Sequence, residues 1–157
     1  MIVIGIDPGT SCGYSVRTVS GLHDSGVWDL RPKRHEGGGM RFLRLRRYLR
    51  ELVQNCRPSV VAYEEVRRHM GTDAAHIYGG IIAVIQEECE TSVPVIPYQG
   101  IPVATVKKFA TGKGNADKAA MGEAARLRWP NRMFTDDNEV DARFIAEAAA
   151  AEMGVAE

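Results

Sequence analysis

The sequence predicts an α/β protein with a five-stranded mixed sheet, three strands antiparallel and then two parallel, and helices on both faces. Short runs rich in β-branched residues alternate with longer segments whose apolar residues recur at helical spacing. Only tight turns separate the first three runs, which favours antiparallel pairing, whereas each of the last two follows a helix, which favours parallel crossovers. A chain of 157 residues can bury one core, so we expect a single domain over 1–157.

The three antiparallel strands are expected at the start of the chain. Residues 2–7 form an apolar run typical of a strand that is buried on both faces. Residues 13–19 and 22–30 alternate in polarity, and the Ser-Gly pair between them is a hairpin turn. Residues 31–39 contain one proline and three consecutive glycines, which predicts a loop.

The two parallel strands are expected to alternate with helices in the rest of the chain. Helical periodicity runs from Met40 to Cys56, and residues 59–65 form a central strand that ends in two glutamates. Asp136 and Glu139 have the spacing of a capping box at the start of the last helix. The remaining predicted elements are helices over 74–91, 102–110, 116–127 and 138–153, and a strand over 93–98.

The charges are balanced overall but unevenly placed. Residues 1–80 hold 12 basic and 8 acidic side chains, and residues 81–157 hold 8 basic and 12 acidic ones. Most of the basic surplus lies in residues 31–50. A basic block on a neutral chain favours an anionic partner, most commonly nucleic acid, and the alternative is a solvated basic face.

Cysteine usage and hydropathy indicate the cellular compartment. Cys12, Cys56 and Cys89 are odd in number and lack C-x-x-C spacing, which fits buried thiols in a reducing cytosol better than disulfides or a zinc site. No apolar run approaches the ~20 residues of a membrane span. The start of the chain lacks the basic segment and small-residue cleavage site of a secretory signal. We therefore expect a cytoplasmic protein.

Three carboxylates are expected to meet at one edge of the sheet. Asp7 ends the first strand, Glu64 ends the fourth, and Asp141 lies in the first turns of the last helix. If strands one and four are parallel neighbours, their carboxyl ends are adjacent. Carboxylate oxygens suit Mg²⁺ or Mn²⁺, and two such ions about 4 Å apart can activate water against a phosphodiester.

Each acid taken alone also has an ordinary structural interpretation. Asp7 could cap a loop through backbone amides. Glu64 could form an ion pair with Arg67 or Arg68. Asp141 could stabilise a helix amino terminus. The convergence of all three in one topology is what favours the metal site.

Two lysines and a glycine-rich loop add a possible phosphate contact. Lys107 lies in a short predicted helix, and Lys118 follows the loop segment GKGNAD. Exposed amides in such a loop can meet a phosphate, although the spacing is not that of a P-loop. Lys118 near the acids could stabilise charge on a scissile phosphate, and the alternative is a solvated lysine at a helix end.

Four segments resemble, in order and spacing, the RuvC family of Holliday junction resolvases, which have an RNase H-like fold. They span nearly the whole chain and read IGIDPGTSCGYSV, VVAYEEV, VKKFATGKGNADKAAM and DNEVDARFIAEAA. The resemblance implies a homodimeric endonuclease with two Mg²⁺ ions per site, for which Mn²⁺ substitutes, that cuts four-way junctions by symmetric nicks leaving 5′-phosphates. Asp7, Glu64 and Asp141 match the family's acids, and Lys107 and Lys118 match two basic residues of its active-site region.

The chain departs from the family at two positions. Asn138 stands where the family often has Asp or His, so either Asn138 or Asp137, four residues before Asp141, is the expected fourth metal ligand. Arg67 stands where some members carry an aromatic wedge, and arginine can also stack on bases. The dense arginines make the chain similar to bacteriophage-encoded members, which would act in a bacterial cell or a phage-infected host.

Contacts with DNA and with a second copy are expected outside the acids. The segment from Ala74 to Cys89 is either the dimer interface or part of the monomer core. No helicase partner can be identified from the sequence. The residues expected to contact DNA phosphates are Lys33, Arg34, Arg44, Arg46, Arg47, Arg50, Arg67, Arg68 and Lys113.

Other functions compatible with parts of the sequence are less complete. The first motif alone resembles the phosphate loop of sugar kinases and actin-like ATPases, but those folds need well over twice this length. A YqgF-like nuclease acting on RNA shares the fold, but its motifs around the second acid and the lysine loop differ. A branched-DNA-binding protein without cleavage would not need three intact acids.

Overall fold

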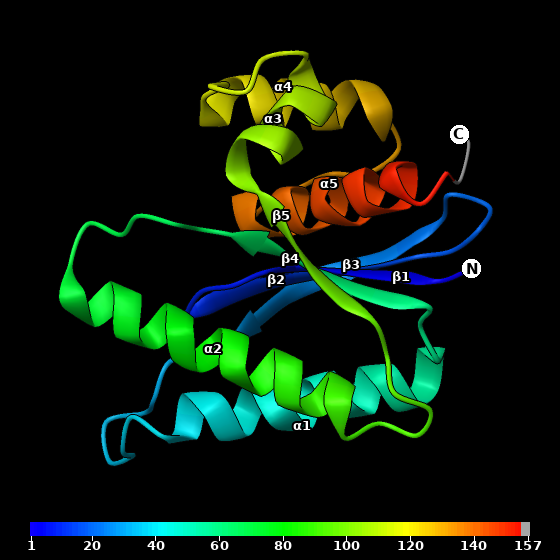
Figure 1. Cartoon of the computed structure of the whole chain (residues 1–157). Coiled ribbons are helices and arrows are strands. Elements are labelled where there is room, and N and C mark those ends of the chain that lie inside the picture. Colours follow the sequence, from blue (N-terminus) through cyan, green and yellow to red (C-terminus); the bar gives the residue numbers. More distant parts are fainter. Residues whose placement is uncertain (155–157) are drawn as a thin grey trace.

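A single five-stranded sheet organises the molecule (Figure 1). The computed structural model describes residues 1–154, so the last three residues of the predicted domain lie outside the described part. The strand order is β3-β2-β1-β4-β5, with β1–β2 and β2–β3 antiparallel and β1–β4 and β4–β5 parallel, as predicted. The strands are β1 (Val3–Asp7), β2 (Ser11–Arg17), β3 (His23–Asp29), β4 (Val60–Glu65) and β5 (Tyr98–Pro102).

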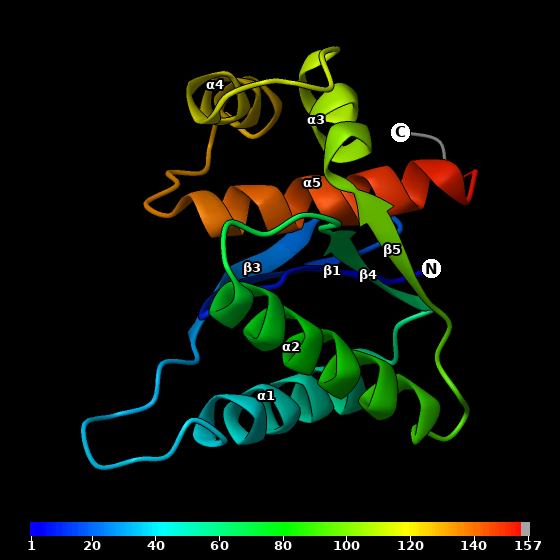
Figure 2. The same cartoon turned by 60° about the vertical axis from the view of Figure 1, so that its left-hand side comes forward.

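Within residues 1–154, five helices cover the two faces of this sheet. Two of them, α1 and α2, pack together on one face, while α5 lies directly on the other with α3 and α4 beyond it (Figures 1 and 2). The predicted arrangement of helices on both faces is therefore confirmed. The helices are α1 (Met40–Cys56), α2 (Thr72–Glu90), α3 (Val103–Thr111), α4 (Lys118–Arg128) and α5 (Asp137–Glu152).

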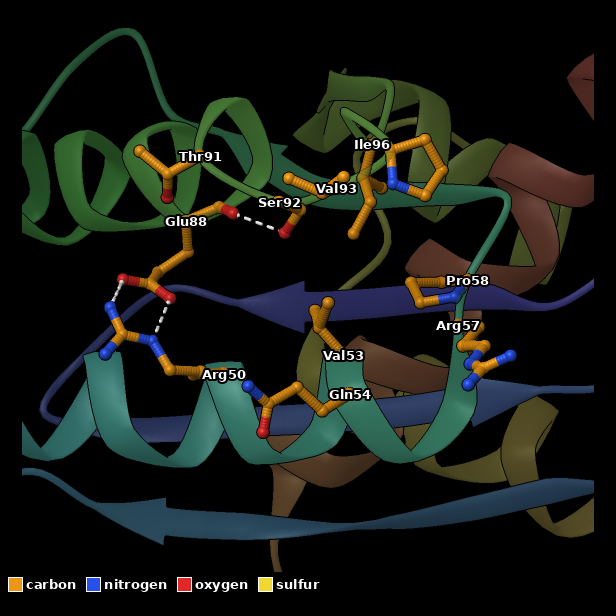
Figure 3. A pocket seen from close by; sticks show the side chains of 11 residues that line it. Arg50, Val53, Gln54, Arg57, Pro58, Glu88, Thr91, Ser92, Val93 and Ile96 are labelled. Carbon is orange, nitrogen blue, oxygen red and sulfur yellow. Dashed lines mark hydrogen bonds and ion pairs between the residues drawn. The ribbon is translucent and has the colours of Figure 1, made fainter.

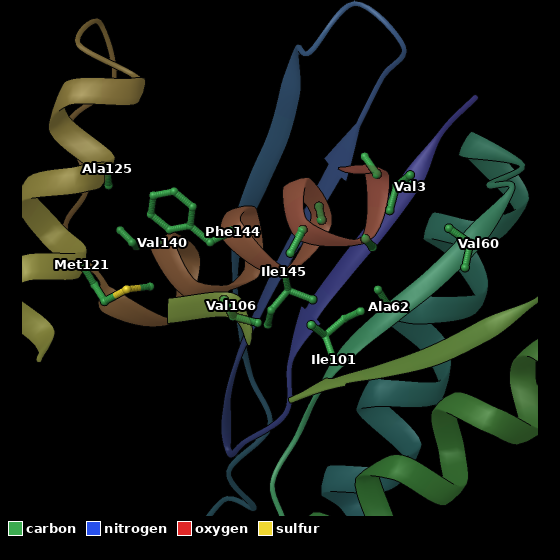
Figure 4. Packing of buried hydrophobic residues seen from close by; sticks show 14 of the residues in the cluster. Val3, Val60, Ala62, Ile101, Val106, Met121, Ala125, Val140, Phe144 and Ile145 are labelled. Carbon is green, nitrogen blue, oxygen red and sulfur yellow. The ribbon is translucent and has the colours of Figure 1, made fainter. Parts of the chain in front are cut away.

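The central strands divide the core into two apolar clusters. Val3 and Val60 belong to the cluster under α5, together with Phe144 (Figure 4). Ile4 and Val61 belong to the cluster under α1 and α2. Because side chains alternate between the faces of a strand, the next residues that face α5 are Gly5 and Asp7 on β1, and Ala62 and Glu64 on β4.

Two glycines allow α5 to lie very close to the sheet. A Cβ atom at Gly5 would collide with the carbonyl oxygen of Ala142 and lie 2.6 Å from the backbone nitrogen of Ala146. A Cβ atom at Gly13 would collide with the carbonyl oxygen of Asn138 and lie 2.5 Å from its carbonyl carbon. The strands and the helix therefore meet backbone to backbone, and the alanines of α5 serve the same close approach.

The strand predicted over 93–98 is wrong, because β5 begins only at Tyr98 and continues to Pro102. Pro94 and Pro97 within the predicted segment lack the N–H group that a strand ladder needs. The peptide bond before Pro94 is cis. Pro97 contributes only its carbonyl oxygen, which accepts a hydrogen bond of 3.0 Å from the backbone N–H of Val61.

The start of α5 matches half of the predicted capping box. The Asp136 side chain caps the helix by accepting a 2.8 Å hydrogen bond from the backbone N–H of Asn138. Glu139 does not complete the box, because it is buried and accepts hydrogen bonds from Ser25 and Arg132 instead. Burial against β3 therefore overrides the local capping pattern.

The cysteines and the helix lengths complete the description. Cys12 and Cys89 are buried, Cys56 is half-buried, and all three are free thiols. Within residues 1–154, no helix combines the length and apolar character needed to cross a membrane.

Candidate active site

Two of the three predicted acids lie side by side at the ends of the central strands. The last recorded pair between β1 and β4 is Ile6 with Tyr63, so one further step places Asp7 opposite Glu64. Neighbouring strands are separated by about 4.8 Å, and both side chains face α5. Glu65 points to the opposite face and forms a 3.2 Å ion pair with Arg67. The register thus selects Glu64 from the Glu-Glu pair, and Arg67 bonds to Glu65 rather than to Glu64.

The third acid reaches the same edge because α5 lies so close to the sheet. Gly13 pairs with Asp7 across the antiparallel β1–β2 ladder. The carbonyl group of Asn138, in the first turn of α5, lies against Gly13. This contact brings the first turns of α5, and with them Asp141, beside Asp7.

The pKa values of the three carboxylates are shifted in the direction expected for buried acids that lie near one another. Burial raises the pKa of Asp7 well above its usual value, and repulsion from Glu64 and then Asp141 raises it further. Burial and the charge of Asp141 raise the pKa of Glu64 to about 7. Burial and the charge of Asp137 raise the pKa of Asp141 to about 6. Such carboxylates are stabilised by a cation that all of them can approach.

The donor set fits a hard divalent ion. The three side chains offer only oxygen atoms, are partly buried, and have no hydrogen bond or ion pair to another side chain in residues 1–154. In the described part of the chain, however, no three His, Cys, Asp or Glu side chains stand close enough to hold an ion as they are placed. The carboxylates would therefore have to rotate toward a bound ion. Repulsion among them opposes this rotation until the cation is present.

Both candidates for a fourth ligand lie in the first turn of α5. Asp137 is exposed, lies 3.5 Å from the Lys118 ammonium group, and raises the pKa of Asp141. Asn138 donates its side-chain amide to Asp136 over 2.7 Å, which leaves its amide oxygen available. The choice between Asp137 and Asn138 stays a prediction.

The two predicted lysines face the acids from different helices. Lys107, on α3, carries a charge that partly offsets the raised pKa values of Glu64 and Asp141. Lys118 is the first residue of α4, and its charge does the same for Asp7 and Asp141. The structure therefore brings all five predicted catalytic residues to one edge of the sheet.

Three arginines of α1 form ion pairs within the chain instead of a free basic face. Arg44 donates to both carboxylate oxygens of Glu36 at 2.6 Å. Arg46 and Arg50 each contact Glu88, with shortest distances of 3.2 and 2.7 Å. These three guanidinium groups are engaged with acids of the same chain, which the sequence periodicity did not indicate. The exposed residues of the predicted DNA-contacting set are Lys33, Arg34, Arg47, Arg50, Arg67, Arg68 and Lys113.

A buried ionic network on α5 was missed by the sequence analysis. Glu147 lies 3.0 Å from Arg17, 2.8 Å from His23 and 3.1 Å from Arg128. Burial alone would raise the pKa of Glu147, but the hydrogen bond with His23 and the charges of Arg128 and Arg17 lower it to about 2. The network therefore holds an ionised carboxylate between α5, the outer strands and the end of α4.

The same network continues toward the amino terminus of α5. Arg143 donates to the Ser25 hydroxyl over 2.7 Å, and that hydroxyl donates to Glu139 over 2.6 Å. Glu139, Arg143 and Glu147 recur every four residues in a helix that is otherwise rich in alanine. That spacing was the available signal. By anchoring one side of α5 to β2 and β3, the network fixes the helix rotation that points Asp141 toward Asp7.

A cavity of substantial size lies elsewhere, between the carboxyl ends of α1 and α2 and the segment that follows α2 (Figure 3). It has a volume of about 900 Å³, and its walls include Val53, Pro58 and Ile96 as well as the Arg50–Glu88 ion pair. None of the acids lines it. The acids instead lie at the carboxyl ends of β1 and β4 and in the first turns of α5.

Known proteins similar to this chain share one family name. No family model matches the chain. It is 36% identical over 128 residues to the crossover junction endodeoxyribonuclease RuvC of Nitratidesulfovibrio vulgaris, covering 76% of this chain and 72% of that protein. It is 30% identical over 149 residues to the RuvC of Halorhodospira halophila, covering 89% and 84%.

Solved structures agree with these relatives. Thermus thermophilus RuvC in complex with a Holliday junction substrate matches with a TM-score of 0.82 and 26% identity, over 100% of this chain and 98% of that one. The yeast mitochondrial Holliday junction resolvase Ydc2 matches with a TM-score of 0.66 and 15% identity, over 98% and 79%, which supports the fold. This chain therefore belongs to the RuvC family of crossover junction endodeoxyribonucleases and has its RNase H-like fold.

Proposed function

We propose that this chain is a single-domain, Mg²⁺-dependent endonuclease that resolves four-way DNA junctions, and other branched DNA, by paired nicks leaving 5′-phosphates. One observation carries the proposal. Asp7, Glu64 and Asp141 come from three elements, have pKa values that burial and neighbouring acids raise, and have no cationic side chain bonded to them within residues 1–154. Such a site is destabilising unless a cation binds there.

The acids and the lysines of the site have different chemical roles. Asp7, Glu64 and Asp141, with Asp137 or Asn138, would hold two Mg²⁺ ions, with Mn²⁺ as a substitute. When bound, such ions supply an activated water and stabilise the leaving oxygen. Lys107 and Lys118 attract the scissile phosphate to the acidic edge and offset its growing negative charge.

We infer that junction arms lie on the exposed cations around this edge. Arg67 and Arg68 lie in the loop after β4, Lys113 lies in the loop between α3 and α4, and Lys118 begins α4. Lys33, Arg34 and Arg47 extend the surface toward α1, whereas Arg44, Arg46 and Arg50 chiefly hold acids of their own chain. The logarithm of the junction-binding constant falls linearly with the logarithm of the salt concentration. Replacing Arg68 or Lys113 with alanine should make that slope shallower by about one unit each. An unchanged slope would remove these residues from the DNA surface.

Paired nicks require two active sites, so we propose a homodimer. On α2, Ile81 and Ile85 are buried in the monomer, which leaves the exposed Gly79 and Ala83 and the half-buried Ile82 for a partner. Light scattering of the purified protein should give twice the monomer mass. A monomer at all concentrations, with and without junction DNA, would contradict this part of the proposal.

The cellular setting follows from the thiols and the substrate. Three free cysteines, two of them buried, suit the reducing cytoplasm where recombining DNA is found. The curated relatives are bacterial proteins. Origin from a bacteriophage stays a prediction.

The central test compares substrates with and without metal. Purified protein is incubated with a synthetic four-way junction, a matched duplex, a flap and a structured RNA, in Mg²⁺, Mn²⁺ or chelator. We expect metal-dependent, symmetric cleavage of the junction, and no cleavage by Asp7→Asn, which should still bind it. Preferential RNA cleavage would favour a YqgF-like activity. Tight junction binding without cutting in any metal would favour a binding protein.

A further inference from the structure

The hydroxyl group of Tyr78 holds the backbone at the end of β4. Tyr78 lies near the start of α2, and its hydroxyl donates a 2.9 Å hydrogen bond to the carbonyl oxygen of Glu64. The same hydroxyl accepts a 3.0 Å hydrogen bond from the backbone N–H of Val66. One side-chain atom thus bridges the two peptide groups that flank Glu65, directly beside the acid of the candidate site.

A neighbouring strand cannot supply the hydrogen bond to the Glu64 carbonyl. In a parallel ladder, the residue opposite Glu65 would donate to the carbonyl of Glu64 and accept from the N–H of Val66. On the β5 side that residue is Pro102. On the β1 side, two steps beyond the Ile6–Tyr63 pair, it is Pro8. Proline has no N–H, so neither neighbour can satisfy the Glu64 carbonyl.

The ring of Tyr78 also anchors the loop that follows. The His69 ring packs on it with a centroid separation of 4.7 Å, while Met70 and Arg68 next to it are exposed. Tyr78 therefore connects α2 both to the end of β4 and to the loop after it. Without the hydroxyl, the backbone carrying Glu64 would end in an exposed loop with an unsatisfied carbonyl.

We propose that Tyr78 is a positioning residue for Glu64, setting the position from which this carboxylate reaches a divalent ion. The inference rests on the proposed function, because it assumes that Glu64 is a metal ligand. Groups that orient metal ligands typically change metal affinity by 10–100-fold when they are removed. Since Tyr78 acts on the backbone of its ligand, we expect an effect of about 10-fold.

The chain offers a matched control for this test. Tyr78→Phe removes the hydroxyl but keeps the ring that packs on His69. Tyr63→Phe makes the same change one residue before Glu64. Within the described residues, the Tyr63 hydroxyl accepts a 3.1 Å hydrogen bond from the side chain of Gln86 and from no backbone group. Both variants remove one tyrosine hydroxyl near the end of β4, but only Tyr78→Phe removes the two hydrogen bonds to the backbone of Glu64 and Val66.

Three measurements decide the proposal. Hydrogen exchange followed by NMR should show the Val66 amide exchanging about 5-fold faster in metal-free Tyr78→Phe, and unchanged in Tyr63→Phe. Calorimetric titration should show Mn²⁺ affinity reduced about 10-fold in Tyr78→Phe alone. The Mg²⁺ concentration for half-maximal junction cleavage should rise by the same factor, while the rate at saturating Mg²⁺ changes little.

The possible failures are distinguishable. If Tyr78→Phe binds Mn²⁺ as tightly as the wild type and Tyr63→Phe, the positioning role is overturned even though the fold and activity stand. An unchanged exchange rate of the Val66 amide would also overturn it, because the hydroxyl would then not hold that N–H group. If the wild type binds no divalent ion, the proposed function fails, and the inference fails with it.

Discussion

Replacing Gly13 with alanine should displace α5 and inactivate the site without touching any acid. An alanine Cβ at this position would lie 2.5 Å from the carbonyl carbon of Asn138 and closer still to its oxygen. Carbon atoms pack at about 3.5 Å, so the first turn of α5 must move by about 1 Å. Because both collision partners are backbone atoms, no side-chain rotation can relieve the contact.

Two quantities follow from a displacement of this size. Overpacking at a tight contact costs about 1–3 kcal/mol of unfolding free energy, which lowers Tm by roughly 2–12 °C in a protein of this length. A misplacement of about 1 Å at a catalytic site can reduce the rate by about 10²-fold. Asp141 lies on the turn that moves, so the loss of junction cleavage should exceed what unfolding explains.

The assay measures both effects on the same preparations. Thermal unfolding gives Tm, and single-turnover junction cleavage in saturating Mg²⁺ is measured well below the Tm of every variant. Gly38→Ala is the control, because a Cβ there would have nothing within 4 Å. If Gly13→Ala cleaves the junction at the wild-type rate, the close approach of α5 does not position Asp141, and the reasoning is refuted.

Further variants test the electrostatics of the structure. Without metal at pH 8, Asp7→Asn should have a higher Tm than the wild type, because burial and like charges raise the pKa of Asp7 and its ionised form destabilises the fold. The difference in Tm should shrink toward pH 5, because the wild-type carboxyl becomes protonated there. In saturating Mg²⁺ it should reverse, because the wild type then gains a bound ion. A lower Tm for Asp7→Asn than for the wild type at pH 8 in chelator would contradict the burial of the charge. The pKa of Glu147 is lowered to about 2, so its stabilisation is complete above its ordinary value near 4.5 and is lost as the pH falls from there toward 2. Glu147→Gln should therefore cost about 3 kcal/mol at pH 7 in urea unfolding, and the difference from the wild type should narrow toward pH 3; a constant difference would mean that the ionised carboxylate is not what stabilises the network. Glu88→Gln weakens the contacts with Arg46 and Arg50 and should cost about 1–3 kcal/mol while junction affinity stays within about twofold; a large change in affinity would place this ion pair in the DNA surface.

The order and type of the elements were predictable because they depend on local patterns. Alternating and helical spacings of apolar residues report which face of each segment is buried, and proline and glycine mark most of the boundaries. The strand predicted over 93–98 is wrong because two signals in that segment disagree. Its apolar residues suggested a strand, but Pro94 and Pro97 prevent ladder bonds, and pairing begins only at Tyr98. Counting donors as well as apolar residues would have corrected the boundary.

The candidate site was predictable as a set of residues but not as an arrangement. Asp7 and Glu64 stand at the ends of two strands, and Asp141 lies in the first turns of the last helix, so the topology alone suggested that the three acids converge. The sequence could not tell that Gly13 admits the carbonyl of Asn138, which is what brings α5 to Asp7. A glycine in a strand signals a close approach but does not name the partner.

The sequence by itself determined the order of the strands and helices, the bounds of most of them and the identity of the three acids. Tertiary structure alone decided the partners of the long charged side chains. Arg50 looks free on a helical wheel, yet α2 places Glu88 within 2.7 Å of it. Glu147 looks like a surface residue, yet Arg17 and His23 meet it in the interior. Periodicity records how deeply a position is buried, whereas the partner of a charge depends on which distant segments the fold brings together.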